Sequence, residues 1–144
     1  MNAKPNDIST LVGVIDSDAY GTGDYSTGWI DMGDWGALQA VVGAGTLGAS
    51  ATLDAKLEQA SDGSGTGVKD ITGKAITQLV KASNDDDQAI ILLRDDELDV
   101  ANGFTHARLT ITVGTATSDA GAMVFGQYAR YTPTALASVV EVVE

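Results

Sequence analysis

The segment His106-Ala-Arg-Leu-Thr-Ile-Thr-Val113 indicates the fold class, because its side chains alternate between apolar and polar. Leucine, isoleucine and valine fall on one side of an extended chain, while arginine and threonine fall on the other. A period of two is typical of a β-strand with one face in a core and one in water. Thr52–Ala60 repeats the pattern, with charged residues at most of the polar positions. Both segments predict strands in a layered β fold.

More short apolar segments follow at regular spacing, and clusters of Gly, Ser and Asp separate them. Besides Thr52–Ala60, the expected strands are Leu11–Ile15, Trp29–Met32, Ala37–Gly43, Ile71–Val80, Gln88–Arg94, Phe104–Gly114 and Ala122–Arg130. This spacing predicts an all-β protein, an antiparallel β-sandwich, with a barrel as the alternative. Gln88–Arg94 contains the longest apolar run, so we expect a central strand covered on both faces. A buried helical turn is the alternative there.

The length of 144 residues favours one domain with a substantial core. Residues 1–10 are mostly polar and predict a flexible N-terminal arm, residues 11–133 form the sandwich, and residues 134–144 form an apolar C-terminal tail. The polar start predicts no signal peptide. No apolar run approaches the ~20 residues of a membrane helix, so we expect no membrane partner.

The charge balance disfavours direct contact with nucleic acid. The formal net charge is −12, whereas phosphate binding needs clustered Lys and Arg. The chain has one histidine and no cysteine, which removes the commonest nucleophiles, bases and transition-metal ligands. We therefore expect no enzyme activity and no cofactor, and a structural or exposed role for His106.

Two kinds of loop motif invite a chemical interpretation and fail on spacing. The glycines of 63–67 with Gly73 and Lys74 resemble a phosphate-binding loop, but Ala75 stands where the motif needs a hydroxyl. The acidic runs at 84–87 and 95–99 offer oxygen ligands for calcium without the spacing of an EF-hand. Solvated acidic turns are the simpler interpretation, so we assign no metal ligands and no paired-carboxylate catalytic site.

Aromatic residues allow a second kind of function. Aromatic planes stack on sugar rings, and the candidates for a sugar-binding face are Trp29, Trp35, Tyr20, Tyr25, Tyr128 and Tyr131. Packing in a core or an interface is the alternative explanation, and we favour it for Trp29 because it lies in a short apolar strand.

Six segments carry a resemblance to a known group of proteins. They are Gly28-Trp-Ile-Asp-Met32, Leu53-Asp-Ala-Lys-Leu-Glu-Gln-Ala60, Asp70-Ile-Thr-Gly-Lys-Ala-Ile-Thr-Gln-Leu79, Leu98-Asp-Val100, Gly103-Phe104 and Arg108-Leu-Thr-Ile-Thr-Val-Gly114. In this series the stretch from Tyr25 to Pro133 resembles small virion proteins that tailed bacteriophages encode among their head genes. The resemblance implies a capsid decoration (cement) protein with a jelly-roll-like sandwich that binds the outside of the shell.

The implied partner is the major capsid protein, whose neighbouring subunits the chain would bridge as a homo-oligomer, with a trimer among the options. The implied location is the virion surface, after synthesis in the host cytoplasm. We expect the two arms to make the contacts, with the tail adding a strand to another subunit or extending as an arm. The expected interface residues are Ile8, Leu11, Leu136, Val139, Val140, Val142 and Val143. A carbohydrate-binding jelly-roll module is the alternative function.

Overall fold

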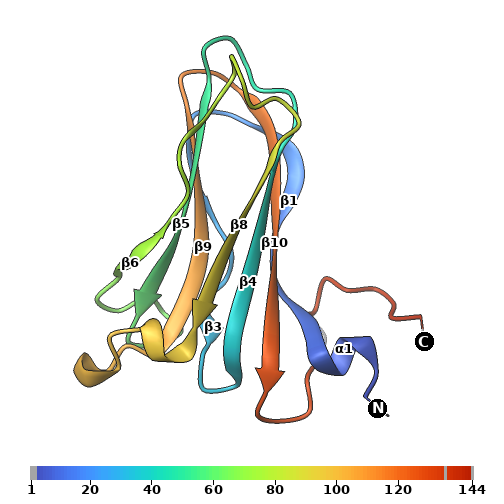
Figure 1. The fold of residues 1–144 in the computed structure, drawn as a ribbon, viewed down its shortest axis with the longest axis vertical. Coiled ribbons are helices and arrows are strands. Elements are labelled where there is room, and N and C mark those ends of the chain that lie inside the picture. Colours follow the sequence, from blue (N-terminus) through green and yellow to red (C-terminus); the bar gives the residue numbers. More distant parts are fainter. Residues whose placement is uncertain (1–2, 135, 144) are drawn as a thin grey trace.

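Two antiparallel sheets pack face to face in the computed structural model, which describes residues 3–134 and 136–143 (Figure 1). The predicted all-β sandwich is confirmed. The four-stranded sheet has the order β1-β10-β4-β8, and the main path of the six-stranded sheet is β2-β9-β5-β6. Two short strands complete the second sheet, with β3 paired to β9 and β7 paired to β5.

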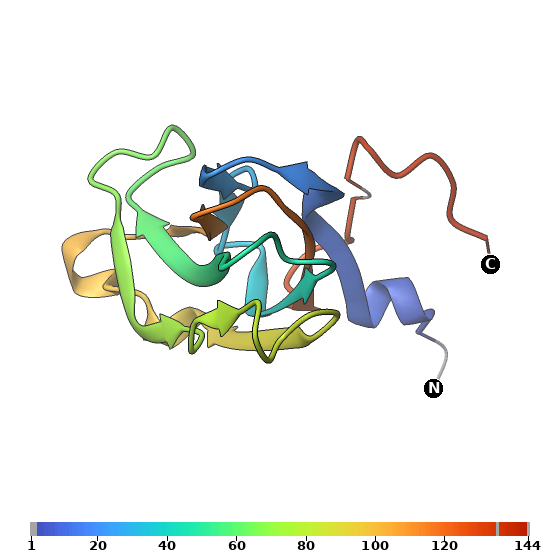
Figure 2. The same ribbon diagram turned by 90° about the horizontal axis from the view of Figure 1, so that it is seen from above.

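The strand bounds are β1 Ser9–Tyr20, β2 Gly23–Ser26, β3 Ile30–Asp31, β4 Trp35–Ala44, β5 Thr52–Ala60, β6 Lys69–Ala75, β7 Leu79–Val80, β8 Gln88–Arg94, β9 His106–Gly114 and β10 Ser118–Ala129. A short helix, α1 Pro5–Ile8, precedes β1. Two 3-10 turns, η1 Asp95–Glu97 and η2 Val100–Asn102, connect β8 to β9. Seen from above, the two sheets lie opposite each other as two layers (Figure 2).

The inward side chains of both sheets form one core. Leu38 and Val42 of β4 face Leu57, Leu109 and Ile111 of the opposite sheet, and all five are at most 1% exposed. Alternation along each strand sends these residues inward, and burial of their apolar area drives the two layers together.

Several elements differ from their predicted extent. β10 begins at Ser118 instead of Ala122, and the strand predicted at Ile71–Val80 is divided into β6 and β7. β1 continues past Ile15 to Tyr20, because its backbone stays paired with β10 as far as Ser118. After a bulge at residues 16 and 17 the pairing resumes at Asp18 and Ala19, although the side chains of residues 16–19 are exposed and give no strand pattern. Residues 20–28, where no strand was expected, contain β2, which pairs with β9.

β8 corrects a prediction about burial. This strand lies at the edge of the four-stranded sheet and pairs with β4, so it is not a central strand. Ile91 and Leu93 face the core, but Ile90 is 57% exposed and Leu92 is 62% exposed. The expectation of cover on both faces is therefore wrong, because an uninterrupted apolar run also arises when the outward residues form an exposed apolar face.

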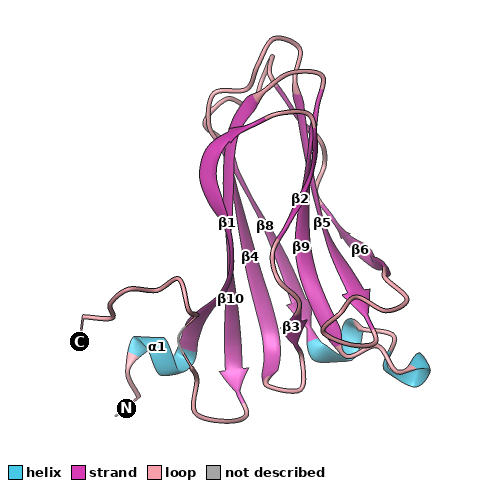
Figure 3. Cartoon of the chain, turned by 180° about the vertical axis from the view of Figure 1, so that it is seen from behind, coloured by secondary structure: helices cyan, strands magenta, loops and turns pink. Residues whose placement is uncertain are grey.

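Both chain ends leave the sandwich at one corner, beside the lower end of β1 and β10 (Figures 1 and 3). Of the expected N-terminal arm, residues 5–8 form α1 and Ser9 and Thr10 belong to β1, where Thr10 is 1% exposed. Residues 136–143 of the tail contain no strand. The remaining arm and tail residues, 1–2, 135 and 144, lie outside the described residues.

Candidate functional site

The outer face of the four-stranded sheet carries two rows of mostly apolar side chains that cross all four strands. Residues directly opposite in an antiparallel pair point to the same side, so the register defines each row. One row is Leu11, Phe125, Gln39 and Leu92, and the next is Val14, Met123, Val41 and Ile90. We call the seven apolar members of these rows the apolar face.

The apolar face lies outside the core. Ile90, Leu92 and Met123 are 57%, 62% and 49% exposed, and the other four members are half-buried by their neighbours on the sheet. None of the seven belongs to the hydrophobic core cluster or to the side chains that pack on it, within the described residues. A contiguous exposed apolar patch is typical of an interaction site in a protein, whereas scattered apolar residues are not.

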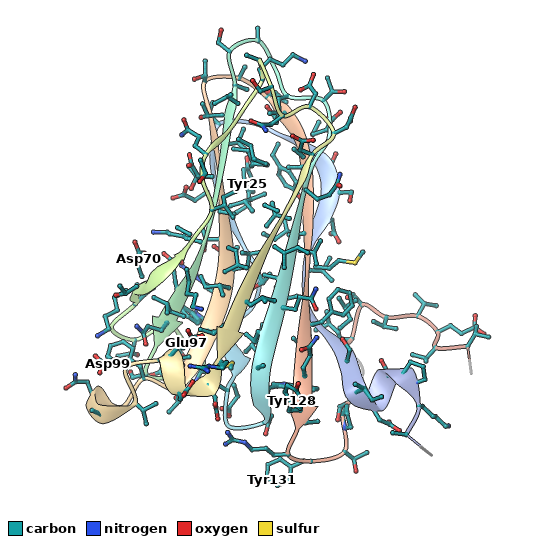
Figure 4. All side chains as sticks on the ribbon, in the orientation of Figure 1. Tyr25, Asp70, Glu97, Asp99, Tyr128 and Tyr131 are labelled. Atoms are coloured by element: carbon teal, nitrogen blue, oxygen red, sulfur yellow. The ribbon has the colours of Figure 1, made fainter. Side chains whose placement is uncertain are left out.

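The outer face of the six-stranded sheet is built in the opposite way. Glu58 is 9% exposed and its carboxylate accepts hydrogen bonds from Arg108 Nε at 2.8 Å and Thr110 Oγ1 at 2.7 Å, with Lys56 Nζ at 3.3 Å. Lys56 also pairs with Asp70 at 2.7 Å, and the hydroxyls of Ser26 and Thr110 share a hydrogen bond at 2.7 Å. These polar groups are satisfied by one another, which suits a face in water (Asp70 is labelled in Figure 4).

Electrostatics keeps Glu58 ionised. Burial by itself raises the pKa of this carboxyl, but the hydrogen bonds from Thr110 and Arg108 and the charge of Arg108 outweigh burial. The pKa of Glu58 therefore lies below its ordinary value. Arg108 in turn lies over the ring of Trp29, 4.6 Å from its centroid, which is a cation–π contact.

Tyr128 extends the apolar face at its lower end (Figure 4). It is 76% exposed and has a φ of 54°, a left-handed conformation that is unfavourable for a bulky side chain. Gly36 opposite leaves room for it, since a Cβ there would lie 3.0 Å from the Cβ of Tyr128. With Leu92 and Arg94, Tyr128 lines a shallow hollow at the edge of the face. Strain held at an exposed tyrosine points to a functional contact.

Of the seven expected interface residues, one lies on the apolar face and the other six lie in the N-terminal arm and the C-terminal tail. Leu11 lies on the apolar face, and it also lines a hollow together with Leu136. Ile8 is 46% exposed, while Val140, Val142 and Val143 are 100%, 45% and 85% exposed. Leu136 and Val139 are half-buried. Val142 and Val143 line a second hollow with Pro5 of α1, so the structure brings the two arms together.

Apart from Leu11, the members of the apolar face are not among the interface residues expected from the sequence. A signal for the face exists in β4, β8 and β10. In these strands the positions between the core residues are also apolar, as at Val41, Ile90 and Met123. The corresponding positions of β5 and β9 are charged or hydroxylated. That contrast between strands distinguishes the two outer faces.

The histidine and the acidic turn that the sequence offers as a base or as metal ligands contact neighbouring residues of the protein. His106 Nδ1 lies 2.8 Å from the hydroxyl of Thr105, and its Nε2 lies 4.0 Å from the Asp31 carboxylate. In the acidic turn at 84–87, Asp85 pairs with Lys81 and accepts a hydrogen bond from the backbone N–H of Leu47 at 2.9 Å. Within residues 3–134 and 136–143, no three His, Asp or Glu gather closely enough to hold a metal ion.

The glycine-rich loop is also organised by a carboxylate. Asp62 accepts hydrogen bonds from the backbone N–H groups of Ser64 at 2.9 Å and Thr66 at 3.0 Å. The hydrogen bonds from Thr66, first among the causes, lower the pKa of Asp62. Gly65 has a φ of 83° and packs directly against the indole of Trp29. The loop therefore folds onto the protein as a closed turn.

The six aromatic residues do not form a single platform. Trp35 is 7% exposed in the core, and Trp29 is half-buried beneath Arg108. The rings of Tyr20 and Tyr25 pack on each other with centroids 4.4 Å apart, and Tyr25 lies between the sheets in their upper part (Figure 4). Tyr128 and Tyr131, at 76% and 72% exposed, lie near each other at the lower end of β10.

The architecture defines the class of this protein, which is an antiparallel β-sandwich with one polar and one apolar outer face. A scan against models of protein families gave no match, and a search of curated proteins gave none either. Among the described residues, no helix is long and apolar enough to span a membrane.

Proposed function

We propose that this chain is a non-catalytic structural protein that decorates the outside of a phage capsid shell and bridges major capsid subunits as a homo-oligomer. The observation that carries the proposal is the apolar face, a broad exposed patch on a chain with a net charge of −12. Exposed apolar area is a liability for a protein that works alone, so it is expected where a partner covers it. The resemblance of Tyr25–Pro133 to phage virion proteins suggests which assembly supplies the partner.

The strand order supports the jelly-roll part of this proposal. When β2 with β3 and β6 with β7 each count as one strand, eight strands are numbered along the chain. Their order across one sheet is then 1-8-3-6, and across the other it is 2-7-4-5. This interleaving of first and last strands supports a jelly roll, a fold common in viral capsid domains and lectins. Fold alone does not imply function, and the argument from surface chemistry remains the stronger one.

The two arms are the proposed contacts with the shell. Ile8, Val140 and Val143 are exposed apolar side chains on segments that extend away from the sandwich at one corner. Short extended arms bury much apolar area per residue when they lie on a neighbour, and they become ordered in doing so. A bridging protein needs two separate contact surfaces, and the arms and the apolar face provide them.

Co-sedimentation with capsid shells that lack their decoration protein tests the proposal. We expect saturable binding at a fixed ratio to the major capsid subunit. Deletion of residues 1–8 or of residues 138–144 leaves β1 and Leu136 in place, so each truncated chain is expected to fold and to bind less. Undiminished binding by both truncated chains contradicts the role of the arms. Absence of binding by the full chain contradicts the function itself.

A carbohydrate-binding module is the second candidate, and the positions of Tyr128 and Tyr131 favour it. Both rings are exposed at one end of the molecule, and Gln127 and Arg94 beside Tyr128 offer hydrogen-bonding groups. A sugar-binding protein binds glycans as an isolated chain, whereas a decoration protein requires assembled shells. Glycan binding that Tyr131→Ala abolishes and Val100→Ala preserves would replace the capsid proposal with this one.

A further inference from the structure

We infer that the apolar face is the docking site for a second copy of this chain, with the two four-stranded sheets packed face to face. The inference deepens the homo-oligomer of the proposed function and rests on it for its biological setting, but it can be tested on the isolated protein. The arms remain available for a different partner, because they leave the sandwich at the corner of the sheet.

Charge is the first argument for a second copy. Two chains that each carry −12 repel one another wherever their acidic groups meet. The two rows of the face contain no charged side chain, since Gln39 is their one polar member and its Oε1 accepts a hydrogen bond from Gln127 Nε2 at 3.0 Å. Every lysine and arginine from Lys56 onward already forms an ion pair. The apolar face is thus a broad neutral surface on an acidic molecule.

The charges around the face select one arrangement of the two copies. Its upper end is acidic, with Asp86 and Asp87 directly before β8 and Asp119 on β10, all exposed. Its lower end carries Arg94, which is 71% exposed and held by one equally exposed partner, Asp96, at 3.2 Å. A two-fold axis along the strands would place acidic end over acidic end. An axis in the plane of the sheet and perpendicular to the strands places β8 over β8 and β10 over β10 in opposite directions. Arg94 then faces Asp86 and Asp87 of the other copy and Tyr128 faces Asp119, and we infer this second arrangement.

The available area agrees with a modest dimer. Strands lie about 4.8 Å apart and outward residues about 6.8 Å apart along a strand, so four strands and seven residues of β4 span roughly 20 by 20 Å. Two such faces have a projected area of roughly 800 Å², and their accessible area approaches the ~1,000 Å² of the smallest specific interfaces. We therefore expect reversible association with a Kd on the order of 10 µM, which needs no rearrangement of the sandwich.

Sedimentation velocity of the full chain across a concentration series tests the inference. Leu92→Asp places a carboxylate within the contact and should raise the Kd at least about tenfold. Val100→Asp is the matched control, because Val100 in η2 is also 62% exposed but lies away from the face. The double variant Ile90→Thr with Leu92→Thr keeps strand-forming residues and should weaken association as well, so a folding defect in one variant does not decide the test.

Salt and charge reversal separate this contact from other forms of association. Added salt screens the repulsion between acidic copies and should strengthen an apolar dimer. Arg94→Glu should weaken it more than Lys69→Glu does, because Lys69 lies on β6 of the other sheet and its replacement changes the net charge equally. Equal effects of the two variants contradict the perpendicular arrangement. A wild-type chain that stays monomeric to about 500 µM, far above the expected Kd, overturns the inference. Shell binding by such a monomer, lost in Leu92→Asp, would assign the face to the capsid and leave the proposed function standing.

Discussion

Replacement of Arg108 by methionine should destabilise the protein, because the buried carboxylate of Glu58 loses its guanidinium partner. Glu58 is 9% exposed and keeps Thr110 and Lys56 as partners, but it loses the hydrogen bond from Arg108 Nε at 2.8 Å. Removal of one member of a fully buried ion pair costs about 3–5 kcal/mol, and the remaining partners reduce that to about 2 kcal/mol here. Loss of the cation–π contact with Trp29 adds about 0.5 kcal/mol.

The effect should depend on pH in a defined direction. The folded-state pKa of Glu58 lies below its ordinary value of 4.5, so its contribution to stability is present above that value and is lost as pH falls through the folded pKa. In Arg108→Met, burial is opposed by fewer partners and the pKa of Glu58 rises. Once Glu58 is neutral in both proteins, the missing cation matters little, so the stability gap should narrow in acid.

Urea unfolding of the wild type and Arg108→Met at pH 7 and at about pH 3.5 measures both effects. At neutral pH we expect a loss of about 2–3 kcal/mol, which corresponds to a fall in Tm of roughly 8–10 °C for a domain of this size. Lys56→Met is the control, because that ammonium is more exposed and should cost no more than about 1 kcal/mol. A gap that is the same at both pH values, or below about 0.5 kcal/mol at neutral pH, refutes the reasoning.

Two further predictions concern backbone positions. Gly126→Ala should destabilise the protein by about 2–3 kcal/mol, because a Cβ at Gly126 would overlap the buried indole of Trp35; thermal unfolding measures the loss, and an unchanged Tm would show that Trp35 can move. Tyr128→Asn should raise the free energy of unfolding of the monomer by about 0.5 kcal/mol, because asparagine tolerates the φ of 54° better than tyrosine; a lower stability would mean that the Tyr128 ring supports the sandwich.

The sequence predicts the bounds of a strand well where one face of the strand is in the core and the other is in solvent. Thr52–Ala60 was predicted with the bounds that the structure shows for β5, because charged and apolar residues alternate along it. The same rule fails for β8, where both faces are apolar and only the partner strand decides which side is buried. A continuous apolar run does not distinguish a covered face from an exposed one.

The candidate site depends on pairing between distant segments, and this is why it was largely missed. Leu11 and Phe125 lie opposite each other across β1 and β10, while Ile90 and Val41 meet across β8 and β4. Each of these residues looks ordinary in its own strand, and the face exists only in the register of all four. The strained backbone of Tyr128 gives no signal in its local sequence either, because tyrosine has no preference for that conformation.

The emergence of both chain ends at one corner has a practical consequence for protein engineering. A domain fused to either terminus would start beside α1 and the tail, where it would crowd both arms at once (Figure 3). The turns at the opposite end of the sandwich, such as residues 81–87 between β7 and β8, lie far from that corner (Figure 1). Foreign peptides are therefore better carried as insertions in those distal turns than as terminal fusions, provided that the Lys81–Asp85 ion pair is kept.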